Sequence, residues 1–498
     1  MKVSVSTGKI EKIREEVIGF GLFQGEKKLE RTLKEVDSHL HGLVQDMLKQ
    51  GDFNGKMGKV LLLPTQEQIG ARRILLVGLG KKKNFSLEKL RQASGGAAAY
   101  VRDQGIETFT VVMEAQGLDI SSIDGARAII EGASLGLYKF DKFKTPDKEE
   151  PRKSISEITL YTPEKRKIPG IKEAIKIGAV VSHATNFVRD LVDDPANEAT
   201  PLMIATTAEK VAKKYKLKCT VLNTPDLHKL RMGGVLAVSQ GSVNSPKFVA
   251  IEYMPRKKGN VFCLVGKGVT FDSGGISIKP SKGMDEMKTD MGGAAAVLGT
   301  IHAAAELKLP VNIVGLMPLV ENMPDGKAQR PGDIIKISNG KTVEVANTDA
   351  EGRLILADAL SYAQKYKPKA IIDMATLTGA CIVALGRHCS GMMGTDEELM
   401  EKLRAAGDKS GDRVWQLPLW DEYKEQIESD VADVRNIGDG DAGAITAGAF
   451  LSHFVGKTPW VHLDIAGPSY IRKPKAYLGK GATGTGVRLL TQLFMDWK

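Results

Sequence analysis

Acidic side chains gather in three glycine-rich segments of this 498-residue chain, at residues 266–280, 287–293 and 347–353. Each segment adjoins an apolar run, and none contains a histidine. Among their charged residues are four acids and two lysines: Lys267, Asp272, Lys279, Asp290, Asp349 and Glu351. Such a charge set is costly to bury without compensation, and a pair of divalent cations would compensate it. The eight histidines contain no H-E-x-x-H zinc motif, so carboxylate oxygens are the expected ligands.

Oxygen-rich ligation suits Mg²⁺, Mn²⁺ or carboxylate-held Zn²⁺, whereas a lysine coordinates only as a neutral amine. Two such ions can polarise a carbonyl and generate a hydroxide near neutral pH. If the backbone is extended at Asp349 and Glu351, their two-residue spacing puts both carboxylates on one side. Two-metal sites also serve phosphoester hydrolysis, so the residues by themselves leave the substrate class open.

Structural roles compete with this interpretation when each residue is taken singly. Thr348 and Glu351 match a capping box for the following helix. Asp290 could be an ordinary N-cap, and Lys267 could be a surface cation. The gathering of all six residues between strand ends and glycine-rich loops favours the metal site.

The elements around these segments predict an α/β domain from about residue 171 onward. Apolar runs predict strands at 249–253, 261–265, 311–316 and 370–374, with helices at 171–192, 292–307 and 354–366. We expect a mixed, mainly parallel sheet with helices on both faces, and the first acidic segment at the C-terminal end of a buried strand. A hairpin is predicted from 334–337 and 342–345, with a type I′ turn at Asn339-Gly340.

The first third of the chain predicts a smaller α/β domain. Its strand candidates are residues 3–5, 60–63, 74–77, 108–112 and 157–161, and Ser86 begins an alanine-rich helix. A charged, proline-bounded stretch at 145–151 is typical of a surface loop. We therefore divide the chain into residues 1–170, which end in a linker, and residues 171–498.

Composition and charge narrow the function classes. The net charge is +10, and residues 1–170 hold 29 basic and 23 acidic residues. Basic runs such as Lys81–Lys83 lack the interleaved aromatic residues of a nucleic-acid surface, so charge alone makes DNA a weak candidate. The four cysteines form no C-x-x-C pair, and we find neither a signal peptide nor a long apolar run. These features predict a cytoplasmic protein with no membrane association.

Five motifs together resemble the leucyl (cytosol) aminopeptidase family, and the resemblance covers essentially all of residues 175–498. They are Lys267 to Lys279, Asp290, the octapeptide NTDAEGRL at 347–354, DMATLTGA at 373–380 and HLDIAG at 462–467. The octapeptide is the most specific of the five. Residues 1–170 resemble the family only loosely.

The resemblance implies a two-metal aminopeptidase, with Mn²⁺ or Zn²⁺ bound and Mg²⁺ or Co²⁺ as alternatives. Asp272 and Glu351 would bridge both ions, Asp349 would complete one, and Lys267 with Asp290 would complete the other. Lys279 and Arg353 would be catalytic: a metal-bound hydroxide would attack the first peptide carbonyl, and a bicarbonate on Arg353 would carry the proton. Cations aimed at a developing oxyanion are the expected stabilising groups.

The family also implies a substrate preference and an assembly. An apolar pocket for leucine and similar side chains would be formed by Met287, Asn347, Thr376 and Gly379. Small-residue changes at 442–449, and Pro468 where threonine is common, bear on the shape of that pocket. Residues 171–498 would be catalytic, residues 1–170 would serve oligomerisation or regulation, and the assembly would be a homohexamer built as a dimer of trimers. Some bacterial relatives bind DNA, which implies sequence-specific DNA binding as an additional role.

Overall fold

The computed structural model describes residues 1–114, 120–145 and 153–497, and the chain forms two compact units. Residues 1–183 and 473–480 make up the first unit, and residues 184–472 and 481–498 make up the second. The predicted surface loop at 145–151 lies almost entirely outside the described residues. Within the described ranges, none of the helices has the length and apolarity needed to cross a bilayer.

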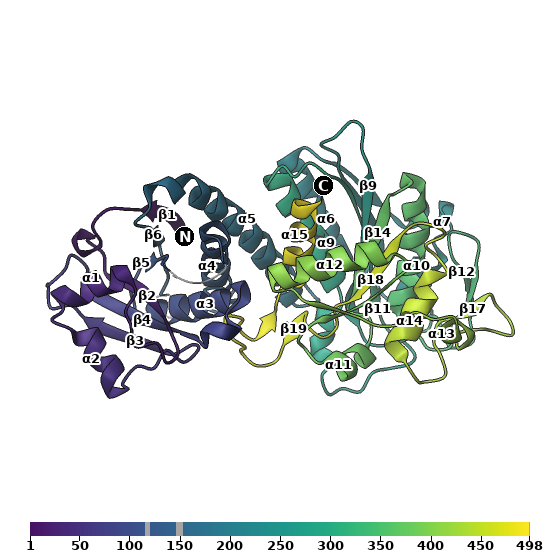
Figure 1. The fold of residues 1–498 in the computed structure, drawn as a ribbon. Helices are drawn as coiled ribbons and strands as arrows, with labels where there is room; N and C mark the ends of the chain where they lie inside the picture. The colour runs from purple at the N-terminus through teal and green to yellow at the C-terminus, as the bar shows by residue number, and fades with distance from the viewer. Residues whose placement is uncertain (115–119, 146–152, 498) are drawn as a thin grey trace. The chain divides into compact units, whose positions relative to one another are not determined.

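The first unit is built on a six-stranded sheet with strand order β1-β6-β5-β2-β4-β3 (Figure 1). Neighbouring strands are parallel except for the β3–β4 pair. Its strands are β1 (Lys2–Ser6), β2 (Val17–Phe23), β3 (Val60–Pro64), β4 (Arg73–Gly80), β5 (Thr108–Val112) and β6 (Glu157–Tyr161). Helices α1 (Arg31–His39) and α2 (Leu43–Gln50) cover one face, and α3 (Leu87–Asp103) and α4 (Ser122–Gly136) cover the other.

Residues 473–480 belong to the first unit although their neighbours on both sides belong to the second. Tyr477 is buried in this segment, at 5% exposure. A Cβ atom added at Gly95 of α3 would lie 2.3 Å from the Tyr477 Cβ, so the two backbones approach closely. A late part of the chain therefore completes the packing of the N-terminal unit.

The second unit is built on a nine-stranded sheet that follows the order β16-β15-β18-β14-β9-β11-β8-β7, with β10 paired to β11. Its strands are β7 (Lys218–Leu222), β8 (Lys247–Tyr253), β9 (Val261–Gly266), β10 (Gly268–Asp272), β11 (Asn312–Asn322), β14 (Ala370–Ala375), β15 (Ser390–Gly394), β16 (Val414–Gln416) and β18 (Trp460–Asp464). The central strands β18, β14, β9 and β11 are parallel to one another. Strand β8 is antiparallel to both of its neighbours, β7 and β11, and β15 is antiparallel to β18.

Helices lie on both faces of this sheet. One face carries α8 (Gly233–Ser239), α10 (Glu351–Ala363) and α14 (Gly443–Ser452), whose apolar side chains share a core with the sheet. The other carries α9 (Gly292–Glu306) and α15 (Val487–Asp496), where Phe262 and Phe494 have ring centroids 5.5 Å apart. The remaining helices are α6 (Pro201–Tyr215), α7 (Thr224–Lys229), α11 (Gly379–Leu385), α12 (Glu397–Ser410) and α13 (Glu422–Glu425), and α5 (Ile168–Asp193) contains the point where the first unit ends. The predicted α/β fold class, with a mixed, mainly parallel sheet between helices, is confirmed.

Two small sheets complete the second unit. β12 (Ile334–Lys336) and β13 (Thr342–Glu344) form the predicted hairpin and continue to β17 (Val434–Arg435), while β19 (Tyr470–Ile471) pairs with β20 (Gly481–Ala482). The predicted type I′ turn is wrong, because only Gly340 has a positive φ, +95°. The amide of Ser338 binds the buried Asp358 carboxylate at 2.8 Å, and the turn spans three residues between Ile337 and Lys341.

Candidate functional site

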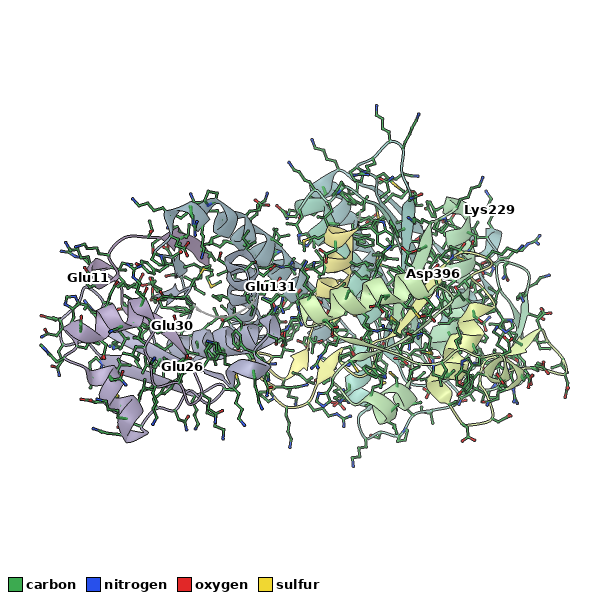
Figure 2. All side chains as sticks on the ribbon, viewed as in Figure 1. Glu11, Glu26, Glu30, Glu131, Lys229 and Asp396 are labelled. Atoms are coloured by element: carbon green, nitrogen blue, oxygen red, sulfur yellow. The ribbon has the colours of Figure 1, made fainter. Side chains whose placement is uncertain are left out.

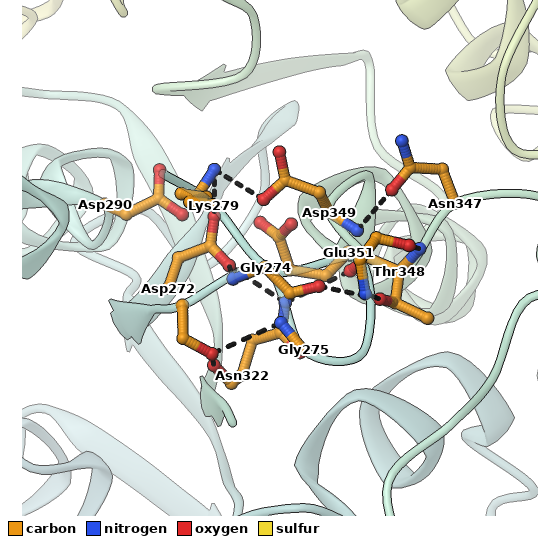
Figure 3. Close-up of polar contacts among 12 residues, drawn as sticks. Asp272, Gly274, Gly275, Lys279, Asp290, Asn322, Asn347, Thr348, Asp349 and Glu351 are labelled. Atoms are coloured by element: carbon orange, nitrogen blue, oxygen red, sulfur yellow. Dashed lines mark hydrogen bonds and ion pairs between the residues drawn. The ribbon is translucent and has the colours of Figure 1, made fainter. Parts of the chain in front are cut away.

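The three acidic segments meet in one cleft of the second unit (Figure 3). Lys267 follows β9, Asp272 ends β10, Asp290 precedes α9, and Glu351 begins α10. The cleft encloses about 1550 Å³, part of which is open to solvent. Ten of the eleven predicted site residues line it: Lys267, Asp272, Lys279, Met287, Asp290, Asn347, Asp349, Arg353, Thr376 and Gly379. The eleventh, Glu351, is buried beside them at 1% exposure.

Two lysines neutralise part of the acidic cluster. The Lys267 Nζ lies 2.6 Å from Asp290 Oδ2 and 2.8 Å from Glu351 Oε1. The Lys279 Nζ lies 2.9 Å from Asp272 Oδ2 and 2.5 Å from Asp349 Oδ1, as Figure 3 shows. Four carboxylates thus face two ammonium groups, which leaves an excess of negative charge.

The structural alternatives for these residues are not realised. Lys267 is buried at 3% exposure and is therefore no surface cation. The N-cap of α10 is Ala350, so Thr348 and Glu351 form no capping box, and the N-cap of α9 is Met291 rather than Asp290. The condition of an extended backbone at Asp349 and Glu351 is not met, because Asp349 lies in a turn and Glu351 in the first turn of the helix.

Local hydrogen bonds hold the first and third segments together. The Thr348 hydroxyl donates to the Gly274 carbonyl at 2.6 Å and accepts from the Ser277 amide at 2.8 Å. Asp272 Oδ1 accepts from the Gly274 amide and from the Asn322 side chain. Gly274 has φ +89°, a conformation that glycine adopts without strain. The segment therefore turns sharply beside Asp272.

Gly352 allows Lys267 to reach Glu351. A Cβ atom added at Gly352 would lie 2.3 Å from the Lys267 Cε and 2.7 Å from its Nζ. Any side chain at this position would collide with the lysine. Packing against Lys267 thus explains why glycine occupies position 352, without any appeal to backbone conformation.

Burial and the charges of neighbouring groups shift the pKa values of the residues in the cluster. Burial raises the pKa of Glu351 above its ordinary value, the nearby Asp272 carboxylate raises it further, and Lys267 opposes the shift. Burial likewise raises the pKa of Asp290. Burial alone would lower the pKa of Lys267, but the Asp290 and Glu351 carboxylates outweigh it and the lysine pKa is raised. Lys267 is thus an ammonium here, and it would have to lose its proton to become a metal ligand.

The donor set fits divalent cations. Ligand atoms of Asp272, Asp290 and Glu351 lie within 4.8 Å of one another. Among the residues that the structure describes, the buried Glu351 Oε2 accepts no hydrogen bond, while Asp290 Oδ2, Asp349 Oδ1 and Glu351 Oε1 are each contacted by a lysine ammonium that is shared with a second carboxylate. Buried carboxylates that outnumber their cations are costly, and cations that prefer oxygen ligands would satisfy them.

Arg353 is a second unusual cation in the cleft. Its Nη1 donates to the Asn436 carbonyl at 2.6 Å, while its buried Nε finds no acceptor within the described ranges. Burial lowers the pKa of Arg353 to about 10, although Glu351 opposes the shift. A guanidinium that remains charged with an unused N–H is suited to hold an anion.

Residues of the motifs at 373–380 and 462–467 form hydrogen bonds that connect strands β14 and β18 beside the cleft. The buried His462 Nδ1 lies 2.6 Å from Asp373 Oδ1, and the Trp460 indole donates to the other oxygen at 2.7 Å. Asp464 accepts from the Thr378 hydroxyl at 2.6 Å and thereby fixes the start of α11. Thr376 donates to Asp290 Oδ1 at 2.7 Å, which links the predicted substrate pocket to the acidic cluster.

Sequence reasoning missed two asparagines that organise the site. Asn322 at the end of β11 donates to Asp272 and to the Thr348 carbonyl. Asn436 accepts from the Ala346 and Asn347 amides and donates to the Asn347 carbonyl. Each stands alone in sequence, tens of residues from the motif it supports, so no local spacing could have identified it.

Comparisons with known proteins identify relatives that match this chain over most of its length. The catalytic-domain model of the cytosol aminopeptidase family matches residues 186–491, and the N-terminal-domain model of that family matches residues 18–147. A probable cytosol aminopeptidase of Roseiflexus castenholzii is 45% identical and covers 100% of this chain and 99% of the relative. Another, from Geotalea uraniireducens, is 47% identical over 94% of each.

Two solved structures share the fold over the whole chain. A mutant of tomato leucine aminopeptidase has a TM-score of 0.90 at 34% identity, covering 100% of this chain and 97% of its own. The bottromycin maturation enzyme BotP in complex with Mn has a TM-score of 0.85 at 34% identity, covering 96% and 99%.

Proposed function

The chain belongs to the cytosol aminopeptidase family and is a metallo-exopeptidase of that family, and from this premise we propose its substrate preference and its chemistry. It releases N-terminal residues from peptides, preferring leucine and other apolar side chains. The observation that carries the proposal is the cluster of four carboxylates, which outnumbers the two lysines that contact it and lies at a cleft that Arg353 also lines.

We propose that two divalent cations, Mn²⁺ or Zn²⁺, occupy the acidic cluster. Asp272, Asp290, Asp349 and Glu351 would hold them, together with Lys267 once it has lost its proton. When bound, the ions would supply Lewis-acid polarisation of the peptide carbonyl and a water of lowered pKa. A free α-amine would bind beside Asp290, which would restrict the site to chain ends.

The remaining roles belong to cations of the chain. Lys279, which contacts Asp272 and Asp349, stabilises the negative charge that develops on the substrate oxygen. Arg353 would hold a bicarbonate through its unused Nε–H, and a bicarbonate held there would supply a proton acceptor. Met287, Asn347, Thr376 and Gly379 contact the side chain of the released residue.

The test is hydrolysis of leucine p-nitroanilide by protein that is stripped with a chelator and resupplied separately with Mn²⁺, Zn²⁺, Mg²⁺ or Co²⁺. We expect activity to return with metal, two ions per chain by elemental analysis, and no activity for Glu351→Ala. No activity with any metal in a folded protein would refute the catalytic proposal. Nitrophenyl phosphate is the control substrate, because its hydrolysis would indicate a phosphoesterase instead.

The assembly and location are also proposals. We propose a cytoplasmic homohexamer, a dimer of trimers, in which residues 1–170 serve oligomerisation or regulation and residues 171–498 are catalytic. The names of the curated relatives and the absence of a membrane-spanning helix among the described residues support the location. Sedimentation analysis tests the assembly, and a monomer or dimer would refute it.

Sequence-specific DNA binding is the alternative, additional role. The exposed basic run Lys81–Lys83 and the basic surplus of residues 1–170 favour it. Binding should weaken steeply with salt, survive Asp349→Ala, and disappear when Lys81–Lys83 are neutralised. Absence of binding at low salt would refute this role.

A further inference from the structure

The cleft contains a second set of charged residues besides the acidic cluster. The set consists of Lys282, Glu286, Arg387 and Arg472. Lys282 precedes the 3₁₀ helix Met284–Thr289, which contains Glu286. Arg387 lies in the loop after α11, and Arg472 directly follows β19. None of these four residues belongs to the proposed metal or catalytic machinery.

Only one cation of this second set has a carboxylate partner. Arg472 binds Glu286 in a two-pronged pair, with Nε 2.7 Å from Oε1 and Nη2 2.7 Å from Oε2. Arg387 donates from Nη1 to the Tyr470 carbonyl at 2.7 Å, and a carbonyl carries no net charge. Among the described residues, no carboxylate lies within ion-pair distance of Arg387 or of Lys282.

Arg387 is held more firmly than Lys282. The Arg387 side chain is half-buried and anchored by its bond to Tyr470, whereas Lys282 is exposed. The backbone before Arg387 is also constrained, because Gly386 has φ +65° and a Cβ atom at Gly467 would lie 2.3 Å from the Gly386 carbonyl oxygen. The loop therefore presents a fixed guanidinium in the cleft wall, with N–H donors beyond the one that Tyr470 uses.

A fixed guanidinium with unused donors and no carboxylate partner is suited to a carboxylate of the ligand. If the proposed function holds, the ligand is a peptide whose α-amine lies at the acidic cluster. We propose that Arg387 binds the C-terminal carboxylate of dipeptide substrates, which makes dipeptides the preferred substrate class. Each further residue extends the chain by up to about 3.3–3.6 Å, so longer peptides carry this group past a fixed site.

The experiment compares matched substrates that differ only in this group. Leucylglycine has a free carboxylate, leucylglycinamide has none, and leucine p-nitroanilide reports the basic activity. For Arg387→Gln we expect kcat/KM on leucylglycine to fall about tenfold to a hundredfold, the loss of a charge-assisted hydrogen bond. The fall should appear mainly in KM, and the other two substrates should change by less than about twofold.

Three variants make the result specific. Arg387→Lys keeps the charge without the planar fork and should show a smaller selective loss. Lys282→Gln should have little effect, and Arg330→Gln, an exposed arginine outside the cleft lining, should have none. An equal fall on all three substrates for Arg387→Gln would indicate a structural role and would overturn the inference, as would no fall on any of them.

The source of the carboxylate is tested with leucyl-aspartyl amide, which carries the charge on a side chain. A selective loss on this substrate, with none on leucylglycine, would overturn the assignment to the C-terminus. Failure of the proposed function looks different, because the unmodified enzyme would then fail to hydrolyse leucine p-nitroanilide with any metal. A selective Arg387 effect requires that basic activity to be intact.

Discussion

Each unit of the molecule buries a glutamate completely, but the two sites differ in how the carboxylate is satisfied. In the first unit, Glu131 of α4 (labelled in Figure 2) accepts from Arg91 Nε at 2.7 Å and from Arg127 Nε at 2.6 Å, one arginine for each oxygen. In the second unit, Glu351 Oε2 accepts no hydrogen bond from the described residues, and Oε1 is contacted by the Lys267 ammonium, which is shared with Asp290.

The difference distinguishes a structural ion pair from a binding site. Around Glu131 the positive side chains match the carboxylate and leave it no need for another partner. Around Glu351 the carboxylates outnumber the lysines, and they open onto a cleft. A buried cluster of charged side chains therefore indicates a binding site when its own positive and negative groups do not balance one another.

The largest expected effect is on activity. Glu351→Ala should lower kcat/KM by at least about a thousandfold, because it removes a proposed ligand of both metals while the fold persists. The measurement is leucine p-nitroanilide hydrolysis, with circular dichroism to check folding. Glu131→Gln is the matched control, and it should retain most of the activity at a temperature where it is folded. Equal losses in both variants would erase the distinction between the two sites.

The next effect is on stability. Glu131→Ala leaves two arginines without their buried partner and should lower the free energy of unfolding by about 3–5 kcal/mol. Denaturant unfolding measures this quantity. Hydrogen exchange should show the loosening in α3 and α4 rather than in α10. A change of less than about 1 kcal/mol would mean that the Glu131 pair is structurally dispensable.

Metal removal should affect only the second unit. At a concentration one hundred times its Kd, a bound ion stabilises the folded state by about 2.7 kcal/mol, and a chelator removes that contribution. We expect Mn²⁺ to slow hydrogen exchange in α9 and α10 and to leave α3 and α4 unchanged. Glu351→Ala should abolish the response. Protection that appears equally in both units would contradict the localised site.

The smallest expected effect, at most about 1.4 kcal/mol per pH unit, concerns a third buried carboxylate, Asp358 of α10. It accepts from the Val235 and Ser338 amides, yet burial raises its pKa to about 7. The folded state thus holds this proton more tightly than the unfolded state, where the pKa is about 3.9. Its stabilising contribution is complete below about pH 4 and is lost as the pH rises through about 7.

Denaturant unfolding of chelated protein at several pH values measures this dependence. The slope from Asp358 should not exceed about 1.4 kcal/mol per pH unit. Asp358→Asn should remove that part of the slope and leave the contribution of the acidic cluster. An unchanged slope in the variant would show that Asp358 titrates as it does in the unfolded chain.

The sequence predicted the elements whose apolar runs are long and uninterrupted. The strands at β4, β9 and β14 were indicated in this way, whereas those at β5 and β6 were indicated by apolar residues interleaved with threonine. Strand β2 was not predicted, because Gly19 and Gly21 interrupt its apolar run and weaken the strand pattern. Tertiary packing explains the glycine at position 21, because a Cβ atom there would lie 2.8 Å from the Leu79 side chain.

The candidate site was predictable as a set of residues but not as a geometry. The three segments carry their chemistry in local motifs, and the resemblance pointed to all of them. The pairing of each lysine with two acids depends on how the strand ends meet, which no local spacing encodes. Arg387 has no motif of its own, and its bond to the Tyr470 carbonyl joins residues 83 positions apart.

The placement of residues 473–480 within the first unit has a consequence for synthesis in the cell. Residues 184–472 leave the ribosome after residues 1–183 and before Tyr477 and its neighbours. Until Tyr477 has been made, the surface at Gly95 that it covers stays open on the nascent chain. The N-terminal unit therefore reaches its final packing only after residues 184–472 of the second unit have been made.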